Sequence, residues 1–169
     1  MAEARHDPDS SKWPTADATG GLFHGMKVHT EYPKPEVTFT QEELESKLTP
    51  EQFLVTQERG TERRWTGKYL KMNDDGVFPC VVCGISLFKT DMKFDSGCGW
   101  LSFSDVVSTD HVALVRDTTL RERTRIEIVC SKCGAHLGHV FEDGPKQSTG
   151  LRYCINSLSL GFEKQADGN

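Results

Sequence analysis

Two short stretches, Cys80-Val81-Val82-Cys83-Gly84 and Cys130-Ser131-Lys132-Cys133-Gly134, determine the architecture that we expect for this chain. Two residues between cysteines let both thiolates of a tight turn face one tetrahedral metal ion, and the glycine that follows lets backbone amides turn toward the sulfurs. Together the two units predict a closed four-cysteine site that holds one zinc ion per chain. Such a shell leaves no open coordination position, so the zinc would stabilise the protein rather than catalyse a reaction.

A redox-active CxxC pair and four unrelated cysteines are the alternatives to zinc. A single CxxC would not separate these possibilities, but two CxxCG units in one chain favour zinc. The intervening segment, residues 84–129, is longer than in a compact zinc ribbon. We therefore expect it to be an insertion between two zinc-linked hairpins.

The sequence on either side of these cysteines predicts short strands and two helices. From Trp65 onward, short apolar runs such as residues 85–88 and 112–115 are separated by glycine-containing turns, and residues 125–128 alternate as a half-buried strand should. Two helix starts precede them, a capping box at residues 40–43 and a Thr-Pro-Glu-Gln start at residues 49–52. The prediction is a mainly antiparallel β domain with two short N-terminal helices.

The chain divides into three parts by composition. Residues 1–36 are polar and rich in Pro, Gly, Asp and Thr, without helical or strand periodicity. We expect them to form a flexible or loosely docked N-terminal extension. The folded domain is predicted over residues 37–163, and residues 164–169 form a C-terminal tail.

Charge and hydropathy exclude several classes of partner. The chain has 169 residues and a formal net charge of -5, which argues against non-specific binding to nucleic acid or anionic membranes. No apolar run approaches the roughly 18 residues that a membrane span needs, and the N-terminus lacks the apolar core of a secretory signal. We expect a cytoplasmic monomer, with organellar import left open, in which cysteines serve as metal ligands or redox groups.

Two cysteines, Cys98 and Cys154, remain outside the CxxC units. Cys98 lies between Gly97 and Gly99, which suggests a mobile, exposed loop. Cys154 lies in a strand-like stretch in which Arg152, Cys154 and Asn156 would share a face, and the arginine would favour the nucleophilic thiolate. The upstream pair His136 and His139 could supply a proton to a leaving group. A buried structural cysteine and a structural or metal-binding histidine pair are the alternatives, and spacing alone does not decide between them.

Residues 80–162 resemble the methionine-R-sulfoxide reductase B family. The motifs that carry the resemblance are, in chain order, CxxC at Cys80, SGCGWxSF at residues 96–103, CxxCGAHLGHVF at residues 130–141, DGP at Asp143 and TGLRYCINSLSL at residues 149–160. Weaker similarity covers residues 49–53 and 66–69. The resemblance implies a pair of antiparallel sheets with peripheral helices and the zinc site of the zinc-containing members.

The resemblance also implies an activity and roles for individual residues. The chain would be a thioredoxin-dependent oxidoreductase that repairs methionine-R-sulfoxide in oxidised proteins or peptides as part of the oxidative stress response. Cys154 matches the nucleophile and Cys98 the resolving cysteine, which would form a redox-active disulfide that thioredoxin reduces. The other matches are His136, His139 and Asn156 on the polar side of the pocket, Trp100 and Phe141 on the substrate side, and Arg152 and Asp143 as supporting charges.

This sequence departs from the family pattern at a few positions. Leu101 and Glu142 stand where proline usually follows the tryptophan and the phenylalanine, and Arg64-Trp65 replaces a proline–aromatic pair. These changes affect loops and spare every residue with a chemical role. A zinc-knuckle binding module without chemistry, and a thiol redox sensor that forms the same disulfide, are the rival functions. Sulfoxide-dependent oxidation of thioredoxin would exclude the first, and reaction with peroxide alone would favour the second.

Overall fold

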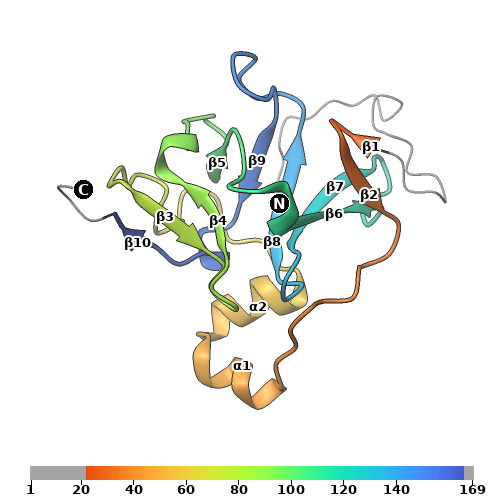
Figure 1. The fold of residues 1–169 in the computed structure, drawn as a ribbon, viewed down its shortest axis with the longest axis vertical. Helices are drawn as coiled ribbons and strands as arrows, with labels where there is room; N and C mark the ends of the chain where they lie inside the picture. The colour runs from red at the N-terminus through yellow and green to blue at the C-terminus, as the bar shows by residue number, and fades with distance from the viewer. Residues whose placement is uncertain (1–21, 166–169) are drawn as a thin grey trace.

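The structure is a computed structural model that describes residues 22–165 (Figure 1). Its strands form a seven-stranded sheet in the order β1-β2-β6-β7-β8-β9-β5 and a three-stranded sheet in the order β10-β3-β4. The larger sheet contains β1 (Leu22–Phe23), β2 (Met26–His29), β5 (Leu101–Phe103), β6 (Val112–Asp117), β7 (Arg125–Cys130), β8 (His136–Phe141) and β9 (Arg152–Ile155). The smaller sheet contains β3 (Gly76–Pro79), β4 (Ser86–Lys89) and β10 (Glu163–Lys164). The prediction of a mainly β fold with two sheets is therefore confirmed.

Both CxxCG units lie at the tips of hairpins, as the spacing suggested. Cys80 and Cys83 lie in the connection between β3 and β4, and the second unit connects β7 to β8. Each hairpin shifts register just before its cysteines, between Phe78 and Pro79 in one and between Ile128 and Val129 in the other. Since one hairpin belongs to the small sheet and the other to the large sheet, the four cysteines join the two sheets.

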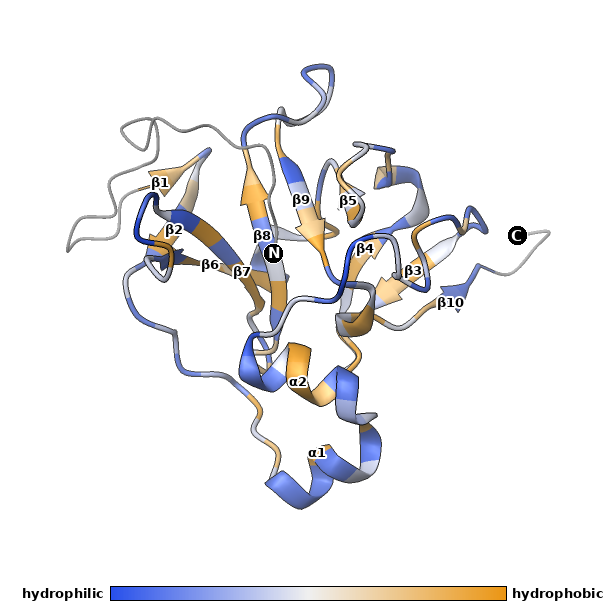
Figure 2. Ribbon diagram, turned by 180° about the vertical axis from the view of Figure 1, so that it is seen from behind, coloured by the Kyte–Doolittle hydropathy of each residue, from blue (hydrophilic) through white to orange (hydrophobic). Residues whose placement is uncertain are grey.

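The two helices begin where their capping residues predict. Helix α1 (Gln41–Lys47) starts after Thr40 and helix α2 (Pro50–Glu58) after Thr49, and each threonine forms a complete capping box. Helix α2 ends at Arg59, which takes the left-handed conformation at φ 59°. Figure 2 shows that α1 is largely hydrophilic, with Leu44 as its buried residue. Within residues 22–165, neither helix is long and apolar enough to cross a membrane.

Aromatic side chains pack between the two sheets. Phe88 of β4 stacks on Phe103 of β5 with ring centroids 4.2 Å apart, and Phe78 of β3 meets the same ring edge-on at 5.4 Å. All three side chains are fully buried, as is Tyr153 of β9 nearby. Burial of aromatic rings of this size dominates the packing energy of a small core. This cluster holds the small sheet against the end of the large sheet where β9 lies.

The segment predicted as a flexible or loosely docked extension contains structure from residue 22 onward, while residues 1–21 lie outside the described part of the chain. Strands β1 and β2 form a hairpin whose two turn residues, His24 and Gly25, both have positive φ, the geometry of a type I′ turn. Phe23 and Val28 are buried. Strand β2 then pairs in parallel with β6. The expectation was therefore wrong for residues 22–29, because two strands of two and four residues are too short to show a period.

Candidate active site

The four CxxC cysteines converge on one point. Their sulfur atoms all lie within 4.8 Å of one another. In each unit the glycine amide donates to the carbonyl of the first cysteine, Gly84 to Cys80 at 2.9 Å and Gly134 to Cys130 at 2.8 Å. Both glycines have φ near +85°, at 85° and 83°, a conformation that other residues adopt only with strain. The repeated glycine is therefore explained by the turn itself.

The donor set fits a tetrahedral ion. Two pairs of sulfurs, Cys80 with Cys133 and Cys83 with Cys130, are 3.7 and 3.5 Å apart. A tetrahedron with metal–sulfur bonds of about 2.3 Å places its sulfurs about 3.8 Å apart. Four cysteines could therefore hold a structural metal ion, and four thiolates leave no position open for a substrate.

Cys154 lies on β9, in the interior of the large sheet. It faces His139 of β8 on one side and Ser102 of β5 on the other. Gly138 is required beside it, because a β-carbon at that position would collide with the Cys154 carbonyl. The sheet therefore fixes the place of the Cys154 thiol relative to an imidazole on the neighbouring strand.

Cys98 is buried rather than exposed, which differs from the expectation from its flanking glycines. Only 8% of its surface is accessible. The loop turns at Gly97 and Gly99, whose φ angles are 75° and 92°, and this directs the thiol inward. The hydroxyl of Ser96 donates to its sulfur at 3.1 Å. Two glycines thus serve to reverse the chain around the cysteine.

The Cys98 and Cys154 thiols lie close enough together that each shifts the pKa of the other. The hydrogen bond from Cys154, supported by Ser96, lowers the pKa of Cys98 to about 4. The same contact, together with burial, raises the pKa of Cys154 well above its ordinary value, while Arg152 opposes this increase. Cys98 therefore loses its proton readily, whereas Cys154 keeps its proton while it lies beside Cys98. Cys154 becomes easier to deprotonate only when it leaves Cys98.

His139 is held by a buried carboxylate that the sequence did not reveal. Its Nε2 lies 2.7 Å from Oδ2 of Asp117. Burial raises the pKa of Asp117, but hydrogen bonds from His139 and Thr119 outweigh it and leave the pKa well below the usual range. The carboxylate is therefore ionised and can only accept, so Nε2 of His139 carries the hydrogen. Burial lowers the pKa of His139 to about 4, which leaves a neutral ring with a lone pair on Nδ1.

His136 has a matching partner. Its Nδ1 lies 2.6 Å from Oε2 of Glu127, which is fully buried. Burial raises the pKa of Glu127, but the hydrogen bonds from His136 and Tyr32 outweigh it and lower the pKa overall. The rings of His136 and His139 meet edge-on with centroids 5.7 Å apart. Two ionised carboxylates thus fix the tautomer and orientation of two neighbouring imidazoles.

Asn156 already uses both ends of its amide within the protein. Its Oδ1 accepts from the backbone N–H of Glu62 at 3.0 Å, and its Nδ2 donates to the Leu137 carbonyl at 3.1 Å. The Glu62 carbonyl in turn accepts from Nε1 of Trp100 at 2.9 Å. Asn156 therefore positions the wall that Trp100 forms. Asn156 also lines the small cavity with Cys154 and His139, so its predicted place on the polar side of the pocket stays a prediction.

Arg152, Asp143 and Phe141 form a cluster beside Cys154. The Arg152 guanidinium donates to both carboxylate oxygens of Asp143, at 2.8 and 3.2 Å. Its carbon lies 4.5 Å from the centroid of the Phe141 ring. Arg152 is 3% exposed, so its charge acts on Cys154 through little water. The predicted residues are brought together, with Phe141 packed under the arginine.

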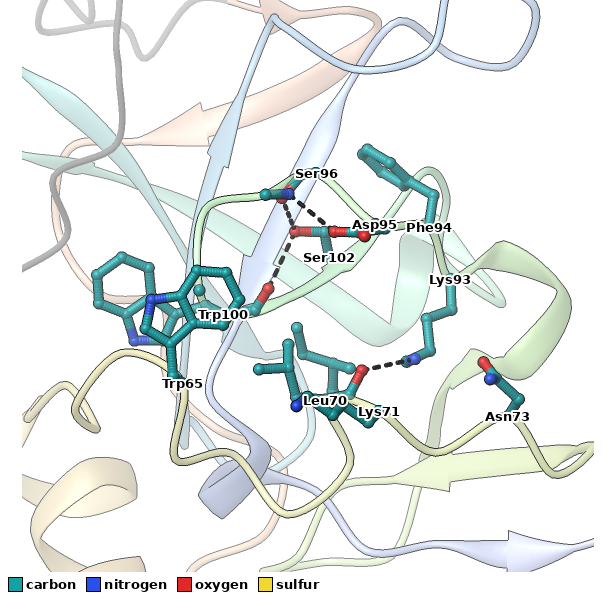
Figure 3. Close-up of a pocket in the computed structure, with 13 residues that line it drawn as sticks. Trp65, Leu70, Lys71, Asn73, Lys93, Phe94, Asp95, Ser96, Trp100 and Ser102 are labelled. Atoms are coloured by element: carbon teal, nitrogen blue, oxygen red, sulfur yellow. Dashed lines mark hydrogen bonds between the residues drawn. The ribbon is translucent and has the colours of Figure 1, made fainter.

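A small cavity connects these groups. It is lined by Thr61, Trp100, Gly138, His139, Cys154, Ile155 and Asn156. A larger hollow of about 420 Å³ is lined by residues 93–97 and 99–102, with Trp65 and Lys71 also around it (Figure 3). Trp100 belongs to both linings. Cys154 and His139 border the small cavity and not the larger hollow, so the chemistry belongs there.

Comparison with known proteins agrees with this arrangement. The SelR domain family matches residues 48–164. A relative named peptide methionine sulfoxide reductase MsrB, from Methanosarcina mazei, is 52% identical over 76% of this chain and 90% of its own length. Methionine-R-sulfoxide reductase B1 of Drosophila melanogaster is 49% identical over 96% of this chain and 79% of its own. Methionine-R-sulfoxide reductase B3 of Mus musculus, described as mitochondrial, is 52% identical over 75% of this chain and 49% of its own.

Proposed function

This chain belongs to the SelR family, whose relatives are methionine-R-sulfoxide reductases, and we propose that it reduces methionine-R-sulfoxide in oxidised proteins and peptides. Cys154 is the nucleophile and Cys98 the thiol that resolves the oxidised enzyme. The observation that carries this proposal is the position of Cys154, which lies near the Cys98 thiol and pairs across the sheet with His139. A structural cysteine would need neither neighbour.

The first step transfers oxygen from the substrate to Cys154. The Cys154 thiol and the sulfoxide become a Cys154 sulfenic acid and methionine, so Cys154 sulfur is oxidised and the substrate sulfur is reduced. When Cys154 moves away from Cys98, the main cause that raises the pKa of Cys154 is lost, and the Arg152 charge then favours the Cys154 thiolate. The substrate thus activates the nucleophile by displacing the Cys98 contact.

His139 carries the proton in this step. Its neutral ring offers the Nδ1 lone pair, which accepts the Cys154 proton and returns it to the sulfoxide oxygen as the S–O bond breaks. Asp117 at 2.7 Å stabilises the imidazolium that forms in between. His136, fixed by Glu127, supports the edge of the His139 ring. Each histidine therefore acts while one of its ring nitrogens is bound to a buried carboxylate.

Trp100 provides the apolar wall for the substrate methyl group. It is 4% exposed, its Nε1 is bound to the Glu62 carbonyl, and the Arg64 guanidinium lies 5.0 Å from its ring. Trp100 and His139 both line the small cavity, and a cavity with one fixed apolar group and one polar group would admit one sulfoxide epimer, with the oxygen toward His139 and the methyl toward Trp100. We propose that this sets the preference for the R epimer.

Regeneration uses Cys98. Its thiol condenses with the Cys154 sulfenic acid, which forms the Cys98–Cys154 disulfide and releases water. A thioredoxin dithiol then reduces this disulfide and becomes oxidised itself. The nearness of the two thiols, each of which shifts the pKa of the other, supports this step.

We further propose that the four-cysteine site holds one zinc ion and that the protein works as a cytoplasmic monomer. Soft thiolates in a tetrahedral arrangement suit zinc, and ligand cysteines fit a reducing compartment. Among the described residues, the exposed large hydrophobic side chains are Leu22, Tyr32, Leu54 and Trp65, each on a different element or loop. Scattered apolar residues of this kind do not require a partner.

An assay with the two separate epimers tests the proposal. Dabsylated methionine-R-sulfoxide and methionine-S-sulfoxide are incubated with the protein, thioredoxin, thioredoxin reductase and NADPH. We expect methionine from the R epimer, with stoichiometric NADPH oxidation. Equal use of both epimers, or NADPH oxidation only with peroxide, would contradict the proposal.

A further inference from the structure

A segment that precedes the matched family domain contacts the hydrogen-bond network of the active site. The SelR match begins at residue 48, whereas residues 22–37, here called the N-terminal arm, run from β1 past the large sheet toward α1 (Figure 1). The arm is anchored at both ends. Strand β2 pairs with β6 through Val28 and His29, and the Val37 amide donates to the Lys132 carbonyl in the second CxxC unit at 2.9 Å.

Between these anchors the arm places Tyr32 on Glu127. The Tyr32 hydroxyl donates to Oε1 of Glu127 at 2.6 Å. The other oxygen of the same carboxylate accepts from Nδ1 of His136, also at 2.6 Å. Tyr32, which lies outside the family domain, is therefore linked to the imidazole of His136 through the Glu127 carboxylate.

Arg59, the residue that ends α2, completes the arrangement. Its Nη2 lies 3.2 Å from Oε1 of Glu127 and 3.9 Å from Oδ1 of Asp117. Its guanidinium carbon is 5.1 Å from the centroid of the Tyr32 ring. Tyr32 and Arg59 thus share one oxygen of Glu127 and hold each other by a cation–π contact.

We propose that Tyr32 is a positioning residue for His136, acting through Glu127, an inference that rests on the proposed function. Glu127 has no accessible surface, so its oxygens depend on protein donors. With the hydroxyl in place, the carboxylate is fixed at one oxygen and directs the other at His136. Without it, the carboxylate rotates toward Arg59 and the imidazole loses its fixed orientation.

The matched variants are Tyr32→Phe and His24→Gln. The first removes only the hydroxyl and keeps the ring under Arg59. The second replaces the imidazole that contacts Glu142, at 2.8 Å, on the exposed surface and leaves Glu127 untouched. Both are made in the full-length chain and assayed with methionine-R-sulfoxide and dithiothreitol. We expect Tyr32→Phe to lower kcat roughly tenfold without a change in KM, and His24→Gln to behave as the wild type.

A second readout reports on His136 directly. In nitrogen-15 NMR spectra, the Nδ1–H signal of His136 should shift in Tyr32→Phe, while that of His111, which contacts the Ser86 carbonyl at 2.7 Å, should stay in place.

Three results would overturn the proposal: an unchanged kcat in Tyr32→Phe, an equal loss in His24→Gln, or an unshifted Nδ1–H signal of His136 in Tyr32→Phe. A wild-type protein that does not reduce the sulfoxide would refute the proposed function instead, and the NMR signals would still test the link from Tyr32 to His136.

Discussion

Replacement of one metal ligand should destabilise both sheets at once. Cys80→Ser removes one of four sulfurs that lie within 4.8 Å of one another and join the β3–β4 hairpin to the β7–β8 hairpin. Structural zinc binds cysteine sites with about 10–16 kcal/mol, which is also folding free energy. Shared equally, each thiolate contributes about 2.5–4 kcal/mol. For a chain of this length, each kcal/mol changes the Tm by about 2–4 °C, so we expect the Tm to fall by about 5–16 °C.

The assay combines calorimetry with zinc analysis of the same sample. Cys98→Ser is the matched control, because it changes a buried cysteine outside the metal site to a hydroxyl among the hydroxyls of Ser96 and Ser102. It should keep one zinc per chain and a Tm within about 4 °C of the wild type. The reasoning would be refuted by a Cys80→Ser protein with an unchanged Tm, or by a metal-replete wild type without bound metal.

Three other outcomes follow from the site. Trp100→Ala should lower kcat/KM for methionine-R-sulfoxide by at least about tenfold, or 1.4 kcal/mol, while Trp100→Phe, which keeps an apolar ring, should lose less; equal values for the two variants would count against the wall. Cys98→Ser should lower the pKa of Cys154, because the contact that raises it most is lost; the pH dependence of iodoacetamide alkylation measures this, and an unchanged profile would contradict it. Burial lowers the pKa of His139 to about 4, below its unfolded value near 6.5, so the native state binds fewer protons between these pH values and stability is lost as the pH falls through this window. Urea unfolding at pH 7.5 and pH 5 should differ by about 2 kcal/mol, and a flat profile would argue against a buried neutral ring.

Local sequence predicted the elements whose signals are local. Thr40 and Thr49 each form the capping box that the residues three positions later indicated, because a cap depends on four consecutive residues. The two CxxCG turns formed as expected for the same reason. The N-terminal hairpin was missed because its strands are short and its turn begins with His24, a residue that takes positive φ less often than Asn or Gly.

The carboxylates that bind the two histidines were not predictable from the periodicity of the sequence. The alternation at residues 125–128 placed Glu127 on a solvated face, but residues 126–130 of β7 are all buried. Tyr32 and Arg59 cover Glu127 on the face that was expected to meet water. Asp117 ends β6 and likewise gave no local signal. A buried acid is recognisable only when the segment that covers it is known, and here that segment comes from distant parts of the chain.

The roles of Cys98 and Cys154 are most directly tested by a single turnover of Cys98→Ser. With methionine-R-sulfoxide in excess and no reductant, this protein should form one equivalent of methionine per chain. It should then carry a sulfenic acid on Cys154 that dimedone traps and mass spectrometry locates, and its turnover with thioredoxin should fall steeply. The account would be contradicted if no methionine formed, if dimedone labelled a residue other than Cys154, or if Cys98→Ser kept full turnover with thioredoxin.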